Sequence, residues 1–133
     1  MDKKYEIVWR DPQKTVLKVN YQPSIDWSDG LSANIEAMDA IREVQNDVLL
    51  FHDTSQSTID LLGFGSVHDL FYNKLPRPPQ NLKMIVVVFR SPNVVKSVGA
   101  SIEILDKLFF KRKYAHIVGS LEEAERLIAQ AGF

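Results

Sequence analysis

Two continuous apolar runs constrain the fold more than any other feature of this sequence. They are VLLF at residues 48–51 and MIVVVF at residues 84–89, and five of the six residues in the second run are Ile, Val or Phe. Strands covered on both faces are apolar at nearly every position, whereas strands with one wet face alternate. Branched and aromatic side chains also favour strands. We therefore expect two central parallel strands buried between layers of helices.

The beginning of the chain predicts an antiparallel hairpin. Apolar residues occupy alternate positions in residues 5–9, and after a turn at 11–13 the alternation resumes in residues 15–21. Period-two alternation on both sides of a turn is typical of paired strands. We expect this hairpin to lie at the side of the sheet.

Four later segments have the three-and-four spacing of helices that lie on a core. They cover residues 27–45, 66–75, 93–111 and 121–131. Asp26 is the expected N-cap of the first, and Ser120 opens a capping box before the last. The core-facing stripe of the first helix should comprise Leu31, Ile35, Met38, Ile41 and Val44.

A short strand at residues 114–118 completes the order of elements, which is a hairpin, a helix and then a strand and a helix three times over. This alternation predicts an α/β fold with a mostly parallel five-stranded sheet, right-handed crossovers and four helices. At 133 residues the chain has the usual size of one domain. We expect a single domain over residues 1–133.

Composition excludes several classes of function. Sixteen basic and seventeen acidic residues give a net charge of −1, which disfavours nucleic-acid binding. The absence of cysteine removes disulfides and thiol chemistry and fits a reducing compartment. No apolar run approaches the roughly 20 residues of a membrane-spanning helix. We expect a cytoplasmic protein without membrane insertion.

A motif after the first buried strand carries a resemblance to a known family. The chain has Asp-Thr-Ser at residues 53–55 and DLLGFG at residues 60–65. This pattern resembles that of the anti-sigma-factor antagonists, the STAS-like or SpoIIAA-like family, with a one-residue gap. The matching residues are Asp53, Ser55, Asp60, Gly63 and Gly65. The resemblance implies the SpoIIAA-like fold over the whole chain.

Further motifs resemble a bacterial branch of small proteins that share this fold. They are WRD at residues 9–11, KTV at 14–16, WSD at 27–29 and SLEEA at 120–124. Members of that branch are inferred to be interaction or regulatory modules. The resemblance therefore implies a non-enzymatic protein that needs no cofactor.

One departure concerns the regulation of the family. Leu61 stands where the family has a phosphorylatable serine. Ser55, Ser57 and Thr58 lie nearby, but loop hydroxyls more often bond to backbone groups. A receiver domain, with Asp53 as phosphate acceptor and Ser91 as companion, is the alternative signalling fold. It is disfavoured because the opening hairpin supplies no acidic pair for Mg²⁺.

Enzymatic and metal chemistry are weakly supported. Asp53 lies between His52 and Ser55, but adjacent strand residues point to opposite faces, which argues against a working triad. The histidines lack the spacing of a zinc site, and His52 is best explained as a hydrogen-bonded histidine of the core or rim. A hydrolase that uses Ser55 or Asp53 is a remote alternative.

Two hypotheses about function remain. The first is binding of another protein, or self-association as a homodimer, through residues 54–75 and the surplus apolar side chains Val95, Ile104 and Phe110. The second is binding of a small apolar or anionic ligand at the carboxyl end of the sheet. The candidate rim for either comprises His52, Asp53, Ser55, Asp60, Gly63, Gly65, Arg90 and Ser91.

Overall fold

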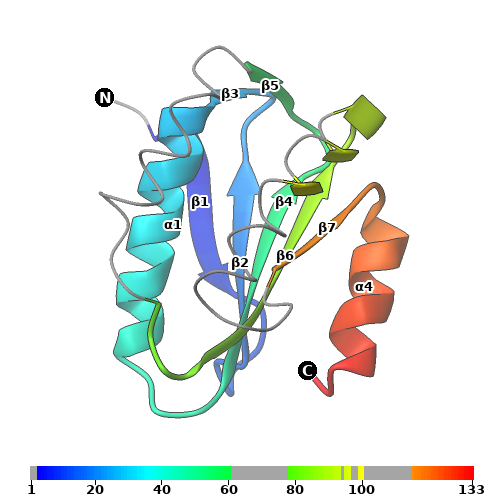
Figure 1. Ribbon diagram of the computed structural model, residues 1–133. Coiled ribbons are helices and arrows are strands. Elements are labelled where there is room, and N and C mark those ends of the chain that lie inside the picture. Colours follow the sequence, from blue (N-terminus) through cyan, green and yellow to red (C-terminus); the bar gives the residue numbers. More distant parts are fainter. Residues whose placement is uncertain (1–2, 61–77, 94, 97–98, 101–114) are drawn as a thin grey trace.

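A five-stranded mixed sheet forms the centre of the molecule (Figure 1). This computed structural model describes residues 3–60, 78–93, 95–96, 99–100 and 115–133. The spatial order of the strands is β1 (Tyr5–Trp9), β2 (Val16–Tyr21), β4 (Val48–Thr54), β6 (Leu82–Phe89) and β7 (Ala115–Val118). The expected α/β class, the hairpin and the five strands are confirmed.

The hairpin and the parallel strands are paired as the two kinds of sequence pattern predict. β1 and β2 are antiparallel, with Tyr5 opposite Tyr21 and Trp9 opposite Leu17. β4 lies between β2 and β6, is parallel to both, and is fully buried from Val48 to Phe51. β7 pairs parallel with β6 at the second edge. The two apolar runs therefore form the two central strands.

Helix α1 (Trp27–Arg42) covers one face of the sheet. It begins at Asp26, whose carboxylate accepts the Asp29 N–H, while the Asp29 carboxylate accepts the Asp26 N–H. Its closest approach is made by small residues: Ala33 and Ala37 are fully buried, with Met38 and Ile41 beside them. We term this side of the sheet the α1 face.

The expected core stripe of α1 was partly wrong. Met38 and Ile41 are buried as predicted, but Leu31, Ile35 and Val44 are only half-buried, and alanines occupy the centre of the contact. Small side chains let a helix backbone come near a sheet, so they dominate the contact although they carry a weak hydrophobic signal.

Helix α4 (Leu121–Gln130) covers the opposite face, which we term the α4 face (Figure 1). Ser120 caps it by accepting the Glu123 N–H at 3.1 Å, which is the serine half of the predicted capping box. Ala124 and Ile128 are buried against a second cluster of sheet residues. Its members from the strands are Val16, Leu49, Phe51, Val86, Val88 and Val118.

A small second sheet, which the sequence did not predict, lies beyond the carboxyl end of the main one. β3 (Ser24–Asp26) pairs parallel with β5 (Thr58–Asp60), with Ser24 opposite Thr58 and Asp26 opposite Asp60. It joins the segment before α1 to the segment after β4. Three-residue strands carry too little periodicity to be detected in a sequence.

The described part contains two helices, α1 and α4, rather than the four expected. The segment expected at residues 66–75 lies outside the described residues. Of the segment expected at 93–111, residues 93, 95–96 and 99–100 are helical and the others lie outside the described part. Neither described helix is long and apolar enough to cross a membrane.

Candidate functional site

The predicted rim lies where β2, β4 and β6 reach their carboxyl ends, beside the small β3–β5 sheet (Figure 1). His52 and Asp53 are consecutive in β4, so their side chains point to opposite faces of the sheet. The α1 face therefore receives His52 and the α4 face receives Asp53. Each residue has its own set of partners.

On the α1 face, His52 is buried between a tyrosine and an asparagine. The Tyr21 hydroxyl lies 2.6 Å from His52 Nδ1, and Asn34 Oδ1 lies 3.3 Å from His52 Nε2. Because Asn34 Oδ1 can only accept, the imidazole proton is on Nε2, and Nδ1 accepts the Tyr21 O–H. Both ring nitrogens are thus satisfied in the neutral form.

Burial shifts the pKa values of the two titratable members of this triad, which consists of Tyr21, His52 and Asn34. Desolvation lowers the pKa of His52 from 6.5 to about 4, since a charged imidazolium would lose its water. Desolvation also raises the pKa of Tyr21. The triad is therefore uncharged at neutral pH.

On the α4 face, Asp53 lies in a partly exposed charged cluster. Its Oδ2 is 3.6 Å from Lys18 Nζ, and the side chains of Lys18 and Asp53 are 29% and 13% exposed. Its Oδ1 accepts the Ser55 backbone N–H at 3.0 Å and the Ser55 hydroxyl at 2.6 Å. The Lys18 ammonium also lies 5.5 Å from the centroid of the Phe51 ring. Both carboxylate oxygens of Asp53 are engaged.

Residues 54–58 are tied down by hydrogen bonds. The Thr54 hydroxyl donates to the Val88 carbonyl in β6. The buried Ser57 hydroxyl donates to the Gln22 carbonyl at 2.6 Å, and the Thr58 N–H donates to the Pro23 carbonyl at 2.6 Å. Gln56, between them, is exposed. The segment is a fixed part of the rim.

The structure brings some of the predicted rim residues together. His52, Asp53 and Ser55 lie at the same end of β4, with the first on a different face from the other two. Arg90 and Ser91 follow the end of β6 and are exposed. Asp60 ends β5. Gly63, Gly65 and Leu61 lie outside the described residues.

The predicted association surface is mostly outside the described part. Val95 is half-buried. Ile104 and Phe110 lie outside the described residues, so the third-helix surface stays a prediction.

Sequence reasoning missed Lys18, Tyr21 and Asn34. Lys18 is a charged residue between the buried Leu17 and Val19 in a strand, and such a residue on the inner rows of a sheet indicates a partner. No local signal links Asn34 to His52, because they come together only when α1 packs on β4.

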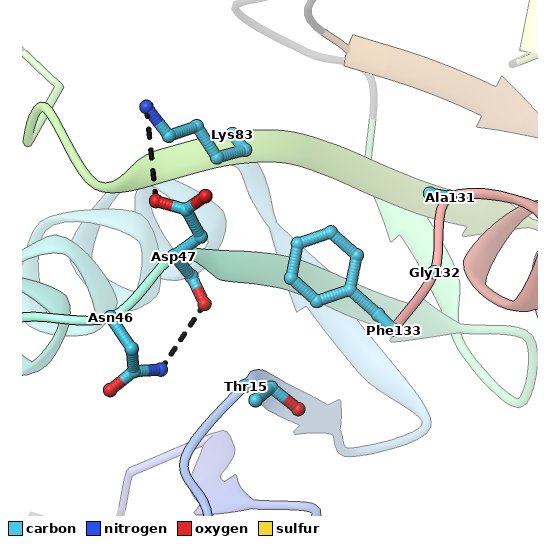
Figure 2. Close-up of a pocket in the computed structure, with 7 residues that line it drawn as sticks. All are labelled: Thr15, Asn46, Asp47, Lys83, Ala131, Gly132 and Phe133. Atoms are coloured by element: carbon cyan, nitrogen blue, oxygen red, sulfur yellow. Dashed lines mark hydrogen bonds and ion pairs between the residues drawn. The ribbon is translucent and has the colours of Figure 1, made fainter.

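The structure also has a pocket at the opposite, amino end of the strands (Figure 2). Its volume is about 550 Å³, and the Phe133 ring points into the space beside the start of β4. Lys83 Nζ lies 3.9 Å from an Asp47 carboxylate oxygen across it. The lining residues are Thr15, Asn46, Asp47, Lys83, Ala131, Gly132 and Phe133. None of the predicted rim residues belongs to this pocket.

Within the described residues, no group of three or more His, Asp or Glu side chains is placed to hold a metal ion. Comparison with protein families finds no family model that matches the chain, and comparison with curated proteins finds no matching relative.

Proposed function

We propose that this protein is a non-enzymatic interaction module that binds another protein through the rim at the carboxyl end of its sheet. The rim that we propose as the binding surface comprises residues 22–26 and 55–58, which include the first of the three β3–β5 pairs, Ser24 with Thr58. The sequence resemblance to anti-sigma-factor antagonists suggests a regulatory partner. The observation that carries the proposal is the anchoring of this rim.

The rim combines an anchored backbone with exposed side chains. The bonds from Ser57 to the Gln22 carbonyl and from Thr58 to the Pro23 carbonyl join its two segments. A surface that is already ordered loses little conformational entropy on binding, so more of the contact energy remains as affinity. The side chains exposed on it are Gln22, Pro23, Ser24, Asp26, Gln56 and Thr58.

The polar groups beneath the rim favour binding over catalysis. An activated serine needs a base that takes its proton, but the Ser55 hydroxyl donates to Asp53, whose other oxygen faces Lys18. His52 is buried on the other face and holds its proton toward Asn34. These groups support the rim from below.

A photo-crosslinking experiment tests the proposal. A photoreactive amino acid is placed at the exposed position 56 and, as a control, at the exposed position 130 near the end of α4. After illumination in the cells that produce the protein, we expect a discrete heteromeric product from position 56 and none from position 130. Mass spectrometry identifies the partner.

Charge variants sharpen the result. Ser24→Arg with Gln56→Arg places two cations on the rim, and Ala129→Arg with Gln130→Arg makes the same change of charge on exposed residues at the end of α4. The rim variant should lose the product while the α4 variant keeps it. Equal products from both positions, or none from position 56, would reject the rim as a protein-binding surface.

A small anionic ligand is the second candidate. The observation that favours it is the partial exposure of Lys18 at the same end of the sheet as the exposed Arg90. Inorganic phosphate and nucleotides are suitable probes in a thermal-shift assay. A stabilisation that disappears in both Lys18→Met and Arg90→Met, without any crosslinked protein, would favour the ligand over the partner protein.

A further inference from the structure

β1 is one of the two edge strands of the five-stranded sheet. β1 pairs with β2 on one side only, and it is the first strand in the spatial order, opposite β7 at the other edge (Figure 1). An edge strand presents unpaired backbone groups that can pair with another strand.

The hairpin register decides which backbone groups point outward. The Arg10 N–H donates to Val16 and the Gln22 N–H donates to Lys4, so even-numbered residues of β1 exchange bonds with β2. The N–H and C=O groups of Tyr5, Ile7 and Trp9 therefore point away from the sheet. Within the described part of the chain, no backbone bond to these six groups is found.

The side chains of the same three residues are partly exposed and can contact a second strand. Tyr5, Ile7 and Trp9 lie on the α1 face and are half-buried. Two are aromatic and placed symmetrically about the third. Burial, together with a hydrogen bond to the Glu36 carboxylate, raises the pKa of Tyr5 to about 12.

We propose that β1 pairs with β1 of a second copy of this chain, in an antiparallel arrangement about a two-fold axis at Ile7. This register places Ile7 opposite Ile7 of the second copy and Tyr5 opposite its Trp9. All three outward residues then exchange backbone bonds, giving six hydrogen bonds. Within the bounds of β1, a shift of the register in either direction leaves fewer outward pairs.

The side chains in this register complement one another. On the α1 face, both aromatic pairs join Tyr5 to Trp9, and such cross-strand pairs stabilise a sheet. On the other face, the exposed Glu6 has two diagonal neighbours on the second copy, Arg10 and Glu6, so attraction and repulsion offset each other there. A closed two-fold contact also ends at two copies, unlike a head-to-tail contact.

The contact is short. β1 has five residues, and just beyond it Lys4 would face Arg10 of the second copy, where like charges limit further pairing. We therefore expect a dimer that dissociates on dilution. The β1 edge is distinct from the rim, so the dimer can bind the partner protein without dissociating.

Amide hydrogen exchange of the native protein, followed residue by residue by NMR, tests the proposal without any mutation. In the monomer, the outward N–H groups of Ile7 and Trp9 should exchange quickly, whereas those of Glu6 and Val8 are protected by β2. Raising the concentration roughly a hundredfold should slow exchange at Ile7 and Trp9 by tenfold or more, while Glu6 and Val8 change little. Exchange at Ile7 that is fast and independent of concentration would overturn the proposal.

A charge-swap experiment tests the two-fold axis itself. Ile7→Lys and Ile7→Glu each bring like charges together at the axis and should sediment as monomers. An equal mixture of the two variants should form a dimer, because lysine then faces glutamate. Circular dichroism of each variant confirms that it is folded. Single variants that dimerise like the native protein, or a mixture of folded variants that stays monomeric, would also overturn the proposal.

Discussion

The environments of two consecutive polar residues differ on the two faces of β4. On the α1 face, His52 is buried, neutral and held between Tyr21 and Asn34. On the α4 face, Asp53 is charged, partly exposed and shared between Lys18 and Ser55. The first arrangement should contribute much more to stability, because a buried polar group loses more when a partner is removed. The comparison shows that two consecutive residues of a strand, such as His52 and Asp53, need not belong to the same site.

The largest effect is expected from His52→Ala. The substitution leaves a cavity and removes a partner from both the Tyr21 hydroxyl and the Asn34 amide. We expect the free energy of unfolding to fall by about 3 kcal/mol. Urea denaturation at neutral pH measures it. Val87→Ala, at the residue paired with His52 on the same face, is the control for loss of volume alone and should cost clearly less.

The pH dependence of the free energy of unfolding should show a contribution from His52 on the α1 face. His52 has a pKa of about 4 in the folded protein and of 6.5 when exposed, so between these values only the unfolded chain gains the proton. Stability should therefore fall as the pH is lowered from about 6.5 to 4, by at most about 3 kcal/mol, and this contribution is fully present above 6.5.

The difference between the native protein and His52→Ala isolates this effect. Groups such as Asp11 and Glu36, whose pKa values are lowered by hydrogen bonds, titrate in both proteins. The gap in stability between the two should narrow as the pH falls toward 4, while Val87→Ala should keep the native profile. A constant gap would show that His52 is not buried in the neutral form.

Asp53→Ala should have a smaller effect. It removes the acceptor of the Ser55 N–H and hydroxyl, and we expect a loss of about 1 kcal/mol in urea denaturation. Asp53→Asn keeps an acceptor oxygen without the charge and should recover most of the loss. If the two variants are equally destabilised, the ion pair with Lys18 outweighs the bonds to Ser55.

Lys18→Met should have the smallest effect, because the Lys18–Asp53 pair is 3.6 Å long and partly exposed. We expect a change of about 0.5 kcal/mol, which shrinks further in high salt. Thermal unfolding at low and high salt measures it. A loss as large as that of His52→Ala would mean that the comparison between the faces is wrong.

The sequence predicted the sheet better than the site. The continuous apolar runs identified β4 and β6, and the alternation identified the hairpin, since burial of strands has a direct periodic signature. The caps at Asp26 and Ser120 were found because their bonds are local.

The site was predicted only as a location. Its position at the carboxyl end of the sheet follows from topology, but its pairings are long-range. The partners of His52 come from β2 and α1, and the Lys18–Asp53 pair joins two strands that the sequence separates by a helix. Neither contact has a fixed spacing in the sequence, so no sequence motif predicts it.

The β3–β5 pairing has a mechanical consequence. It fastens the segment that leaves β4 to the segment that enters α1, at the point where Asp26 caps the helix. A load applied at Gln56 is thereby transmitted to the first turn of α1, two dozen or more residues earlier in the chain. A partner that binds at Gln56 and displaces this segment would therefore also displace α1, the helix that covers His52.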